Sequence, residues 1–496
     1  MLVVFDGRIL SATSPRGEAC DIVIEGDTIV DLVAPGSVKD ENVERLDAAR
    51  RLIIPGLINS HTHSHGGLSK GLGDRWNLEI LQTANPWMGG NRGLEDKYLS
   101  ALITAIDQVE KGTTACYDLF FEFPAPSIDG MEAVARAYRE VGVRAVIAPM
   151  VSDLTFYQSL PGFIEALSRI DGGAAGAMRM GGPDEIVEAL RRLAAQWRHP
   201  DDSLRLGVAP TIPHHCTKEF MLGCRDVARE HGLVMQTHVG EAKYQASSSF
   251  AIFGMSMTRT MDSVGIVGPW FSAAHAVWLD QDDMRLLAER GAQVAHNPGA
   301  NLRLGSGIAA VRDYLRHGVT VGIGTDGCHC SDNQNMFEAM RAASFVSRIR
   351  GLPPQEWLST HEAFRLATEG SARVLGFDKI GKIEKGYKAD LVLLDLDHVN
   401  FMPFNNAVNQ IVHAEDGCGV DKVLIGGRLV VSGGSAVGID KRALAAKADA
   451  AVERLQGLNA DARRVAEMIE PVVVNFCNGL TGNPAVSGLH RLLPAN

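Results

Sequence analysis

A chain of 496 residues is too long for one ordinary domain and suits a large barrel with a smaller companion. With 46% apolar and 22% charged residues, the composition favours a large buried core and argues against disorder. The net charge of −11, without runs of lysine and arginine, argues against nucleic acids and anionic membranes as partners, although not against a small charged substrate.

The eight cysteines are dispersed and form no paired framework, which is typical of a reducing cytoplasm. The first ten residues, MLVVFDGRIL, lack the basic segment and apolar run of a signal peptide. No stretch of eighteen apolar residues occurs, so no transmembrane helix is expected. We therefore expect a cytoplasmic protein.

Both ends of the chain are predicted to form short β-strands. Residues 1–55 contain β-branched runs separated by Asp-Gly, Glu-Gly-Asp and Pro-Gly turn signals. Residues 390–395 are another apolar strand, and VDKVLIGGRLVVSGG predicts a hairpin that turns at Gly426 and Gly427. We infer that residues 1–55 and 378–437 build one small β-sandwich domain, divided by everything between them.

Strand-like and helix-like segments alternate through residues 56–377. The spacing of Tyr98, Leu102 and Ile106 is helical, and Gly112 closes that segment. Eight candidate strands follow one another, namely LIIPGLINSH, TTACYD, VRAVIAPM, LRLGVAP, LVMQTH, WFSAAH, AQVAHN and VTVGIGTD. The pattern predicts an α/β protein with a (β/α)8 TIM barrel. An open doubly wound sheet fits the same pattern, but no GxGxxG motif follows a first strand to support it.

Residues 438–496 form a separate C-terminal helical extension by this reading. An alanine-rich helix is predicted over 441–455 and a second helix near 461–469. The extension either packs on the barrel or forms an oligomer contact; the sequence leaves both alternatives open.

Histidines and one aspartate stand at the ends of candidate strands. His61 and His63 end the first strand, His238 the fifth, His275 the sixth, and Asp326 the eighth. Because a barrel builds its active site at the C-terminal ends of its strands, these five side chains are expected to converge on one mouth. A single such histidine would be explained equally well as a hydrogen-bonded core residue, but chance is a poor explanation for five.

The spacing of His61 and His63 has a geometric consequence. Residues two apart on an extended strand point to the same face, so both imidazoles can reach one ion. Neutral imidazole and carboxylate groups suit Zn²⁺ and Fe(II) alike. Glu241, three residues after His238, is expected on a loop over the mouth as a proton shuttle that does not bind metal. The alternative for Glu241 is a solvated loop carboxylate.

Longer segments around these residues carry a family resemblance. PGLINSHTH, THVGE, SAAHAVWL, VAHNPGANLRLGSGIAAVRDYLRHGVTVGIGTDG and GKIEKGYKADLVLLD together resemble the amidohydrolase superfamily, over roughly residues 1–435. The branch that they look like holds cytosine-, guanine- and S-adenosylhomocysteine-type deaminases and the s-triazine hydrolases.

The resemblance implies one divalent metal ion per chain, zinc or alternatively Fe(II). It implies that the metal ligands are His61, His63, His238 and Asp326. It further implies catalytic roles beside the metal for Glu241, His275 and Asp326. Binuclear members use a carboxylated lysine at the end of the fourth strand, whereas the corresponding segment VAPTIPHHC has no lysine at that point. We therefore expect a single metal.

The chain departs from the family's pattern on the substrate side. Thr211 stands where many deaminases carry histidine, and an extra His65 follows the H-x-H pair, with Lys70 where arginine is common. Cys328-His329-Cys330 replaces a frequent Ala-Ser-Asn; we favour a loop that contacts substrate over a second metal site there. The candidate substrate contacts are Trp76, His214, His215, Cys328 and His329.

Residues 68–91 are predicted to form a long loop that closes over the mouth. Trp76 and Trp87 would then offer a stacking surface to the substrate. Ordinary hydrophobic packing explains the two tryptophans equally well.

These roles together predict a reaction. Asp326 takes a proton from water activated by the metal, Glu241 protonates a ring nitrogen, and His275 holds the water or stabilises the oxyanion. The leading hypothesis is hydrolytic deamination of an aminated N-heterocycle (purine, pyrimidine, pterin or triazine) by a protein that forms a homo-oligomer. The alternatives are hydrolysis of another C–N, C–Cl or amidine bond at the same site, or a non-catalytic scaffold, which would be expected to lack ligands.

Overall fold

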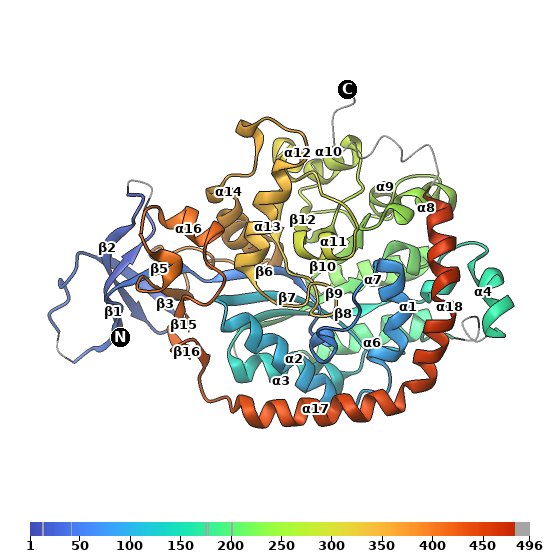
Figure 1. Cartoon of the computed structure of the whole chain (residues 1–496), viewed down its shortest axis with the longest axis horizontal. Helices are drawn as coiled ribbons and strands as arrows, with labels where there is room; N and C mark the ends of the chain where they lie inside the picture. Colours follow the sequence, from blue (N-terminus) through green and yellow to red (C-terminus); the bar gives the residue numbers. More distant parts are fainter. Residues whose placement is uncertain (12–13, 41, 174–175, 177, 200–201, 482–496) are drawn as a thin grey trace.

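The chain folds into a parallel barrel and a separate mixed sheet (Figure 1). The computed structural model describes residues 1–481 apart from 12–13, 41, 174–175, 177 and 200–201. The fold class predicted from the sequence is confirmed, with both chain ends contributing to the smaller sheet. None of the helices in the described ranges combines the length and the apolar character that a membrane span needs.

The barrel strands are paired in chain order. They are β6 (Leu57–Thr62), β7 (Thr113–Phe121), β8 (Arg144–Val151), β9 (Leu204–Pro210), β10 (Val234–Val239), β11 (Phe271–His275), β12 (Gln293–His296) and β13 (Thr320–Ile323). Every pair is parallel. Beyond β13 the chain returns to the first strand, since Asp326 N–H donates to His61 O at 2.9 Å and Thr325 N–H to Asn59 Oδ1 at 3.0 Å. The parallel barrel therefore replaces the open-sheet alternative.

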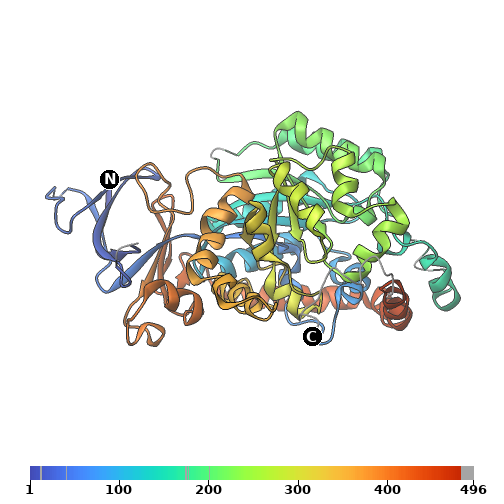
Figure 2. The ribbon, with the colours of Figure 1, turned by 90° about the horizontal axis from the view of Figure 1, so that it is seen from above.

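Helices connect successive strands around the outside of the barrel (Figure 2). Besides α1, which is described below, those between the strands include α2 (Leu94–Val109), α3 (Ile128–Val141), α4 (Phe163–Asp171), α6 (Pro183–Gln196), α7 (Lys218–His231), α8 (Lys243–Phe253), α9 (Met257–Ser263), α10 (Gln281–Glu289), α11 (Pro298–Arg303) and α12 (Val311–His317). After β13 follow α13 (Met336–Arg348), α14 (Thr360–Arg365), α15 (Ser371–Leu375) and α16 (Ala407–His413). In α3, Ser127 accepts the Gly130 N–H at the start, and Gly142 ends the helix at a φ of 88°.

The smaller sheet joins the two chain ends. Its strands are β1 (Leu2–Ile9), β2 (Glu18–Glu25), β3 (Thr28–Val33), β4 (Glu44–Asp47), β5 (Arg51–Pro55), β14 (Leu391–Asp395), β15 (Val420–Ile425), β16 (Arg428–Ser432) and β17 (Ser435–Ala436). Strand β14 lies antiparallel to β5 and so links the two ends. The predicted hairpin is present, because Gly426 and Gly427 connect β15 to β16 with φ of 55° and 73°.

One predicted strand is divided between the two sheets. The segment expected as the first barrel strand contains β5, which belongs to the smaller sheet, and β6, which belongs to the barrel. Gly56 separates them, and a Cβ at Gly56 would overlap the side chain of Thr114. The close approach of β7 therefore requires glycine where the chain passes from one sheet to the other.

A buried ion pair connects the barrel to the smaller sheet. The Arg144 guanidinium at the start of β8 donates to both carboxylate oxygens of Asp390, at 2.8 and 3.1 Å. The two side chains are 9% and 1% exposed. Asp390 also accepts the Gly426 N–H at 2.7 Å, so the carboxylate is held from both sheets.

Replacement of Arg144 by methionine is expected to destabilise the fold strongly. The Asp390 carboxylate would stay buried without its cation, which costs about 3–5 kcal/mol. Urea denaturation followed by tryptophan fluorescence measures the change. Arg50→Met is the matched control, because Arg50 pairs with Asp397 at a site where both side chains are more than half exposed. Similar losses in both variants would contradict the prediction.

Residues 78–89, predicted to lie in a loop, form helix α1 (Leu78–Gly89). Pro86 and the following glycines suggested a loop, but α1 tolerates Pro86 and is capped by Asn77, which accepts the Ile80 N–H at 3.0 Å. The preceding short helix η1 (Ser64–Ser69) follows β6 directly. The rings of Trp76 and Trp87 meet edge to face, with centroids 6.3 Å apart. These two tryptophans thus pack against each other.

The C-terminal extension lies against the barrel. It consists of α17 (Lys441–Leu458) and α18 (Ala460–Leu480), and α18 lies at the end of the barrel remote from the smaller sheet (Figures 1 and 2). Ile469, Val473 and Cys477 on α18 are buried in one apolar cluster with residues of α1 and α4. Of the two alternatives for the extension, packing on the barrel is therefore realised.

Candidate metal centre

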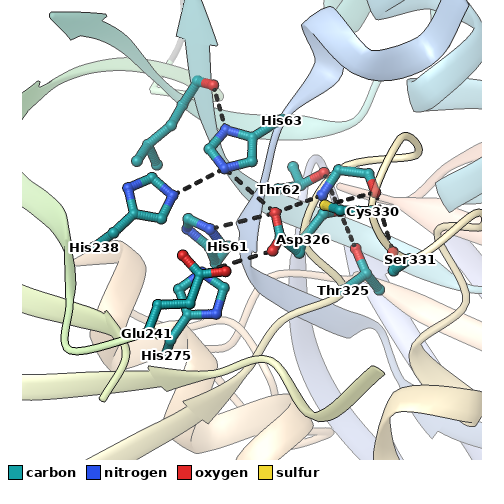
Figure 3. A network of polar contacts seen from close by, with 12 residues as sticks. His61, Thr62, His63, His238, Glu241, His275, Thr325, Asp326, Cys330 and Ser331 are labelled. Carbon is teal, nitrogen blue, oxygen red and sulfur yellow. Dashed lines mark hydrogen bonds and ion pairs between the residues drawn. The ribbon is translucent and has the colours of Figure 1, made fainter. Parts of the chain in front are cut away.

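Four imidazoles and one carboxylate meet at the mouth of the barrel (Figure 3). His61 lies near the end of β6 and His63 directly after that strand, while His238 comes from β10, His275 from β11, and Asp326 from the turn after β13. All five side chains are buried, with at most 7% of any residue exposed. The structure thus brings together the side chains that the sequence placed at the ends of four different strands.

The ligand atoms lie close enough to share one ion. His63 Nε2 is 3.1 Å from His238 Nε2 and 3.3 Å from Asp326 Oδ1. His61 Nε2 and His275 Nε2 lie 3.7 and 3.6 Å from the same carboxylate. Ligand atoms of His61, His63 and His238 lie within 4.8 Å of one another, as do those of His61, His275 and Asp326.

Each imidazole is oriented by an oxygen atom on its far side. The Nδ1 partners are Gln236 Oε1 for His61 (2.6 Å), Leu119 O for His63 (2.8 Å), Thr211 O for His238 (2.6 Å) and Asn301 Oδ1 for His275 (2.9 Å). Because these oxygens accept, Nδ1 carries the proton and the Nε2 lone pair points into the site. The Gln236 amide is itself fixed, since its Nε2 donates to Ser60 O and Ser272 Oγ.

The donor set fits a divalent cation. The Nε2 atoms of His61 and His275 are buried and have no hydrogen-bond partner among the described residues. Buried nitrogens with free lone pairs are costly unless something binds them. Three neutral imidazoles and one carboxylate, with His275 beside them, are ligand types that zinc and Fe(II) both accept.

The electrostatics of the site agree with metal binding. Burial lowers the pKa of His61, His238 and His275, which keeps these rings neutral and their lone pairs available. Burial acts to raise the pKa of Asp326, but the surrounding imidazoles outweigh it and hold that pKa well below the usual range. Asp326 is therefore a carboxylate at neutral pH.

Two of the convergent residues adopt strained backbone conformations. His275 has a φ of 65° and Asp326 a φ of 66°, in the left-handed region that costs a non-glycine residue about 1–2 kcal/mol. Hydrogen bonds hold both turns: Ala276 N–H donates to Val239 O at 3.1 Å, and Gly327 N–H donates to Asp326 Oδ1 at 2.7 Å. The fold thus imposes these turns, and they aim both side chains at the centre.

Glu241 is a second buried carboxyl group next to the histidines. Its Oε2 is 3.7 Å from His275 Nε2, and the residue is 2% exposed. Burial raises the pKa of Glu241 well above its usual range, and the nearby Asp326 and Glu79 carboxylates raise it further. This direction favours the protonated form of Glu241, the form that a proton donor needs. The alternative of a solvated loop carboxylate does not match this burial.

Comparison with known proteins identifies the family. Residues 52–430 match the amidohydrolase family. The chain belongs to the amidohydrolase family. The recognition made from the sequence motifs is confirmed, and the protein is a hydrolase of the amidohydrolase type.

Relatives with named activities cover nearly the whole amidohydrolase chain. A 5'-deoxyadenosine deaminase from Methanothermobacter thermautotrophicus is 31% identical over 437 residues, which are 88% of this chain and 95% of the relative. A 5-methylthioadenosine/S-adenosylhomocysteine deaminase from Thermococcus onnurineus is 28% identical over 432 residues, 87% of this chain and 94% of the relative.

Solved structures show the same fold. An adenosine deaminase from Xanthomonas campestris with bound zinc has a TM-score of 0.79 at 25% identity, covering 92% of this chain and 98% of that one. An atrazine chlorohydrolase from Arthrobacter aurescens, complexed with zinc, has a TM-score of 0.80 at 25% identity, covering 91% of this chain and 100% of that one.

Two adjoining cavities lie beside the candidate metal centre of this amidohydrolase. The smaller is lined by Glu241, Asp326 and four histidines, together with residues of α1. The larger has a volume of about 360 Å³. Both cavities share the lining residues Gln82, Asn85, Met150, Thr211 and Ile212. The larger cavity therefore adjoins the candidate metal centre, where a substrate-binding space is expected.

Two of the five candidate substrate contacts line these cavities. His329 lines the smaller cavity and His215 the larger one. Trp76, His214 and Cys328 are not among the described residues that line either cavity. His214 Nε2 instead lies 3.0 Å from Ser248 Oγ, and Cys328 is buried beside Thr104. Contact between these three residues and a substrate stays a prediction.

Several residues of the site were missed by the reading of the sequence. Gln82 and Asn85 line both cavities. The helical spacing of α1 could have indicated them, but the segment was predicted to be a loop. Gln236 orients His61 and lies two positions before His238. Alternation along a strand places residues two apart on one face, so Gln236 was also detectable.

Replacement of Gln236 by methionine is expected to weaken metal binding about 10- to 100-fold, because His61 loses the acceptor that orients it. Competition with a chromogenic chelator measures the affinity for zinc. Gln293→Met at the start of β12 is the control, since Gln293 donates to Pro269 O far from the mouth. Unchanged zinc affinity in Gln236→Met would show that the amide is dispensable.

Proposed function

We propose that this protein is a zinc-dependent hydrolytic deaminase of an aminated purine, most simply an adenosine derivative, that releases ammonia. The observation that carries the proposal is the convergence of histidine Nε2 atoms and the Asp326 carboxylate, with the buried Glu241 carboxyl 3.7 Å from His275 Nε2. Burial raises the pKa of Glu241, which favours a proton donor beside this centre. The deaminase names of two relatives and the zinc in two structural neighbours support the substrate class and the metal. Fe(II) remains the alternative metal.

The proposed ligands are His61, His63, His238 and Asp326, for one ion per chain. A divalent cation bound there supplies Lewis acidity that makes water a nucleophile at neutral pH. The Asp326 carboxylate accepts a proton from the attacking water. Glu241 donates its proton to the ring nitrogen next to the attacked carbon, which relieves the negative charge that develops there. The same proton-transfer residues then protonate the departing amino group.

His275 has a narrower role than the sequence suggested. Its Nδ1–H donates to Asn301 Oδ1, so its Nε2 accepts rather than donates. A group that accepts can hold the attacking water by one O–H, but it cannot donate to an oxyanion. Of the two roles considered for His275, we therefore propose that it positions the water.

A second candidate function is release of a different leaving group, such as chloride. The structural likeness to an atrazine chlorohydrolase favours this candidate. The raised pKa of Glu241 favours the first candidate, because the ring nitrogen of an aminated purine needs a proton donor. The cytoplasmic location and the homo-oligomeric state stay predictions.

The test is a product assay on zinc-loaded protein. Ammonia release is measured with adenosine, 5'-deoxyadenosine, guanine, cytosine, a pterin and an aminated triazine, and chloride release with a chlorotriazine. Ammonia from a purine would support the proposal, and chloride without ammonia would replace it by the second candidate. Absence of both products from zinc-loaded protein would overturn both.

A further inference from the structure

The C-terminal extension forms part of the wall of the larger cavity. Asn459, at the junction of α17 and α18, and Ala462, in the first turn of α18, both line it. Asn459 is 4% exposed, and its Nδ2 donates to Gly90 O at 2.9 Å while its Oδ1 accepts from Asn91 Nδ2 at 2.8 Å. The junction is thereby tied to the turn that follows α1.

The rest of α18 holds α1 over the mouth of the barrel. Its buried residues pack in one cluster with Leu78, Leu81, Ala84 and Met88 of α1. Phe476 of α18 also stacks on Phe163 of α4, with ring centroids 4.6 Å apart. Because Gln82 and Asn85 of α1 line both cavities, the extension sets the position of residues that reach the metal centre.

The lining of the larger cavity is apolar or neutral. It includes Phe121, Phe156, Tyr157, Met178 and Met180, with neutral amides from α1 and Asn459. The described lining residues include no aspartate, glutamate, lysine or arginine, and burial lowers the pKa of the one histidine among them, His215, to about 4, so that its ring is neutral at pH 7. A phosphate or a zwitterion placed here would lose water without gaining a charged partner, which is unfavourable.

We propose that the C-terminal extension is part of the substrate site, where Asn459 and Ala462 form a wall that selects a heterocyclic substrate with an uncharged apolar substituent of limited length. The proposal rests on the proposed function for the position of the heterocycle. The ring reacts at the metal centre, and its substituent reaches the larger cavity past Gln82 and Asn85. Ala462, half-buried at the cavity wall, sets the depth available to that substituent.

The test is Ala462→Phe with Ala460→Phe as its matched control. Ala460 lies two residues earlier on the same helix, is exposed, and is not among the described residues that line the cavity. In Ala462→Phe, kcat/KM for 5'-methylthioadenosine is expected to fall by about tenfold or more, since a pocket that loses room for a methylene group discriminates about 10- to 200-fold. The value for adenine, which has no substituent, is expected to change less than about twofold.

A binding measurement tests this inference independently of the proposed deaminase activity. Calorimetry on the Glu241→Gln protein, with and without Ala462→Phe, measures the Kd of 5'-methylthioadenosine directly. The Kd is expected to rise about tenfold with Ala462→Phe and to stay unchanged with Ala460→Phe. Adenosine 5'-monophosphate is expected to bind at least about tenfold more weakly than 5'-methylthioadenosine.

The outcomes are distinct. If no substrate yields ammonia, the proposed function fails, while the calorimetric arm still decides whether the extension forms the wall. The proposed wall is refuted if Ala462→Phe changes neither kcat/KM for the two substrates nor the Kd of 5'-methylthioadenosine. It is also refuted if kcat/KM falls as much for adenine as for 5'-methylthioadenosine. Tighter binding of the nucleotide than of the methylthio nucleoside would refute the apolar character of the subsite.

Discussion

Replacement of His238 by alanine is expected to remove the metal and the turnover together. Its Nε2 lies 3.1 Å from His63 Nε2 at the centre of the donor set, and its Nδ1 is fixed on Thr211 O. Without this ligand the remaining groups hold an ion weakly. A site that has lost its ion no longer lowers the pKa of water from 15.7 towards ~7, so ammonia release is expected to fall by at least about a thousandfold.

Elemental analysis of the purified proteins measures the first effect and an ammonia assay the second. The wild type is expected to carry about one zinc per chain and His238→Ala only a small fraction of that. His231→Ala is the matched control, because His231 ends α7 and is exposed. A His238→Ala protein that keeps both its zinc and its turnover would refute the metal centre.

Replacement of Glu241 by glutamine is expected to abolish turnover while leaving the metal in place. Glutamine keeps the shape of the side chain but carries no acidic proton, so the ring nitrogen loses its donor. Loss of a general acid costs about 100- to 10,000-fold in rate. Because Glu241 is not a proposed ligand, the zinc content of Glu241→Gln is expected to equal that of the wild type. Loss of zinc in this variant would instead place Glu241 among the ligands.

The same residue predicts a pH dependence. Burial first, then the Asp326 and Glu79 carboxylates, raise the pKa of Glu241 well above its usual range. Glu241 is protonated below that raised pKa and can donate there; above it the proton is lost. We therefore expect kcat/KM to fall by about tenfold per pH unit on the alkaline side, and this limb to be missing from the residual activity of Glu241→Gln. An identical alkaline limb in both proteins would assign it to another group.

The convergence of the strand-end residues shows how far sequence reasoning reaches. His61 and His63 alternate along one strand, and His238 and His275 each end an apolar run, so their placement needs only local patterns and the rule that parallel strands share a carboxyl end. Asp326 follows the eighth strand by the same argument. The distances among their ligand atoms, and the bonds that orient each ring, come from contacts between strands and could not be read from those patterns.

Helix α1 is the clearest place where the sequence misled. Pro86 and the adjoining glycines are loop signals in isolation, and the helical spacing of Leu78, Leu81 and Ala84 has meaning only against the apolar face of α18. Because that face lies nearly 400 residues further along the chain, tertiary packing outweighed the local signal.

The sequence by itself determined the order of the barrel strands, the shared sheet of the two chain ends, and the residue types offered at the mouth. These features depend on periodicity and turn chemistry within short segments, which each segment carries independently. Only the tertiary structure decided that Glu241 is buried with a raised pKa, that Gln236 orients His61, and that Asn459 lines the cavity while it is bonded to Gly90. Burial, pKa and cavity shape depend on neighbours that are remote in the chain, and no local pattern encodes them.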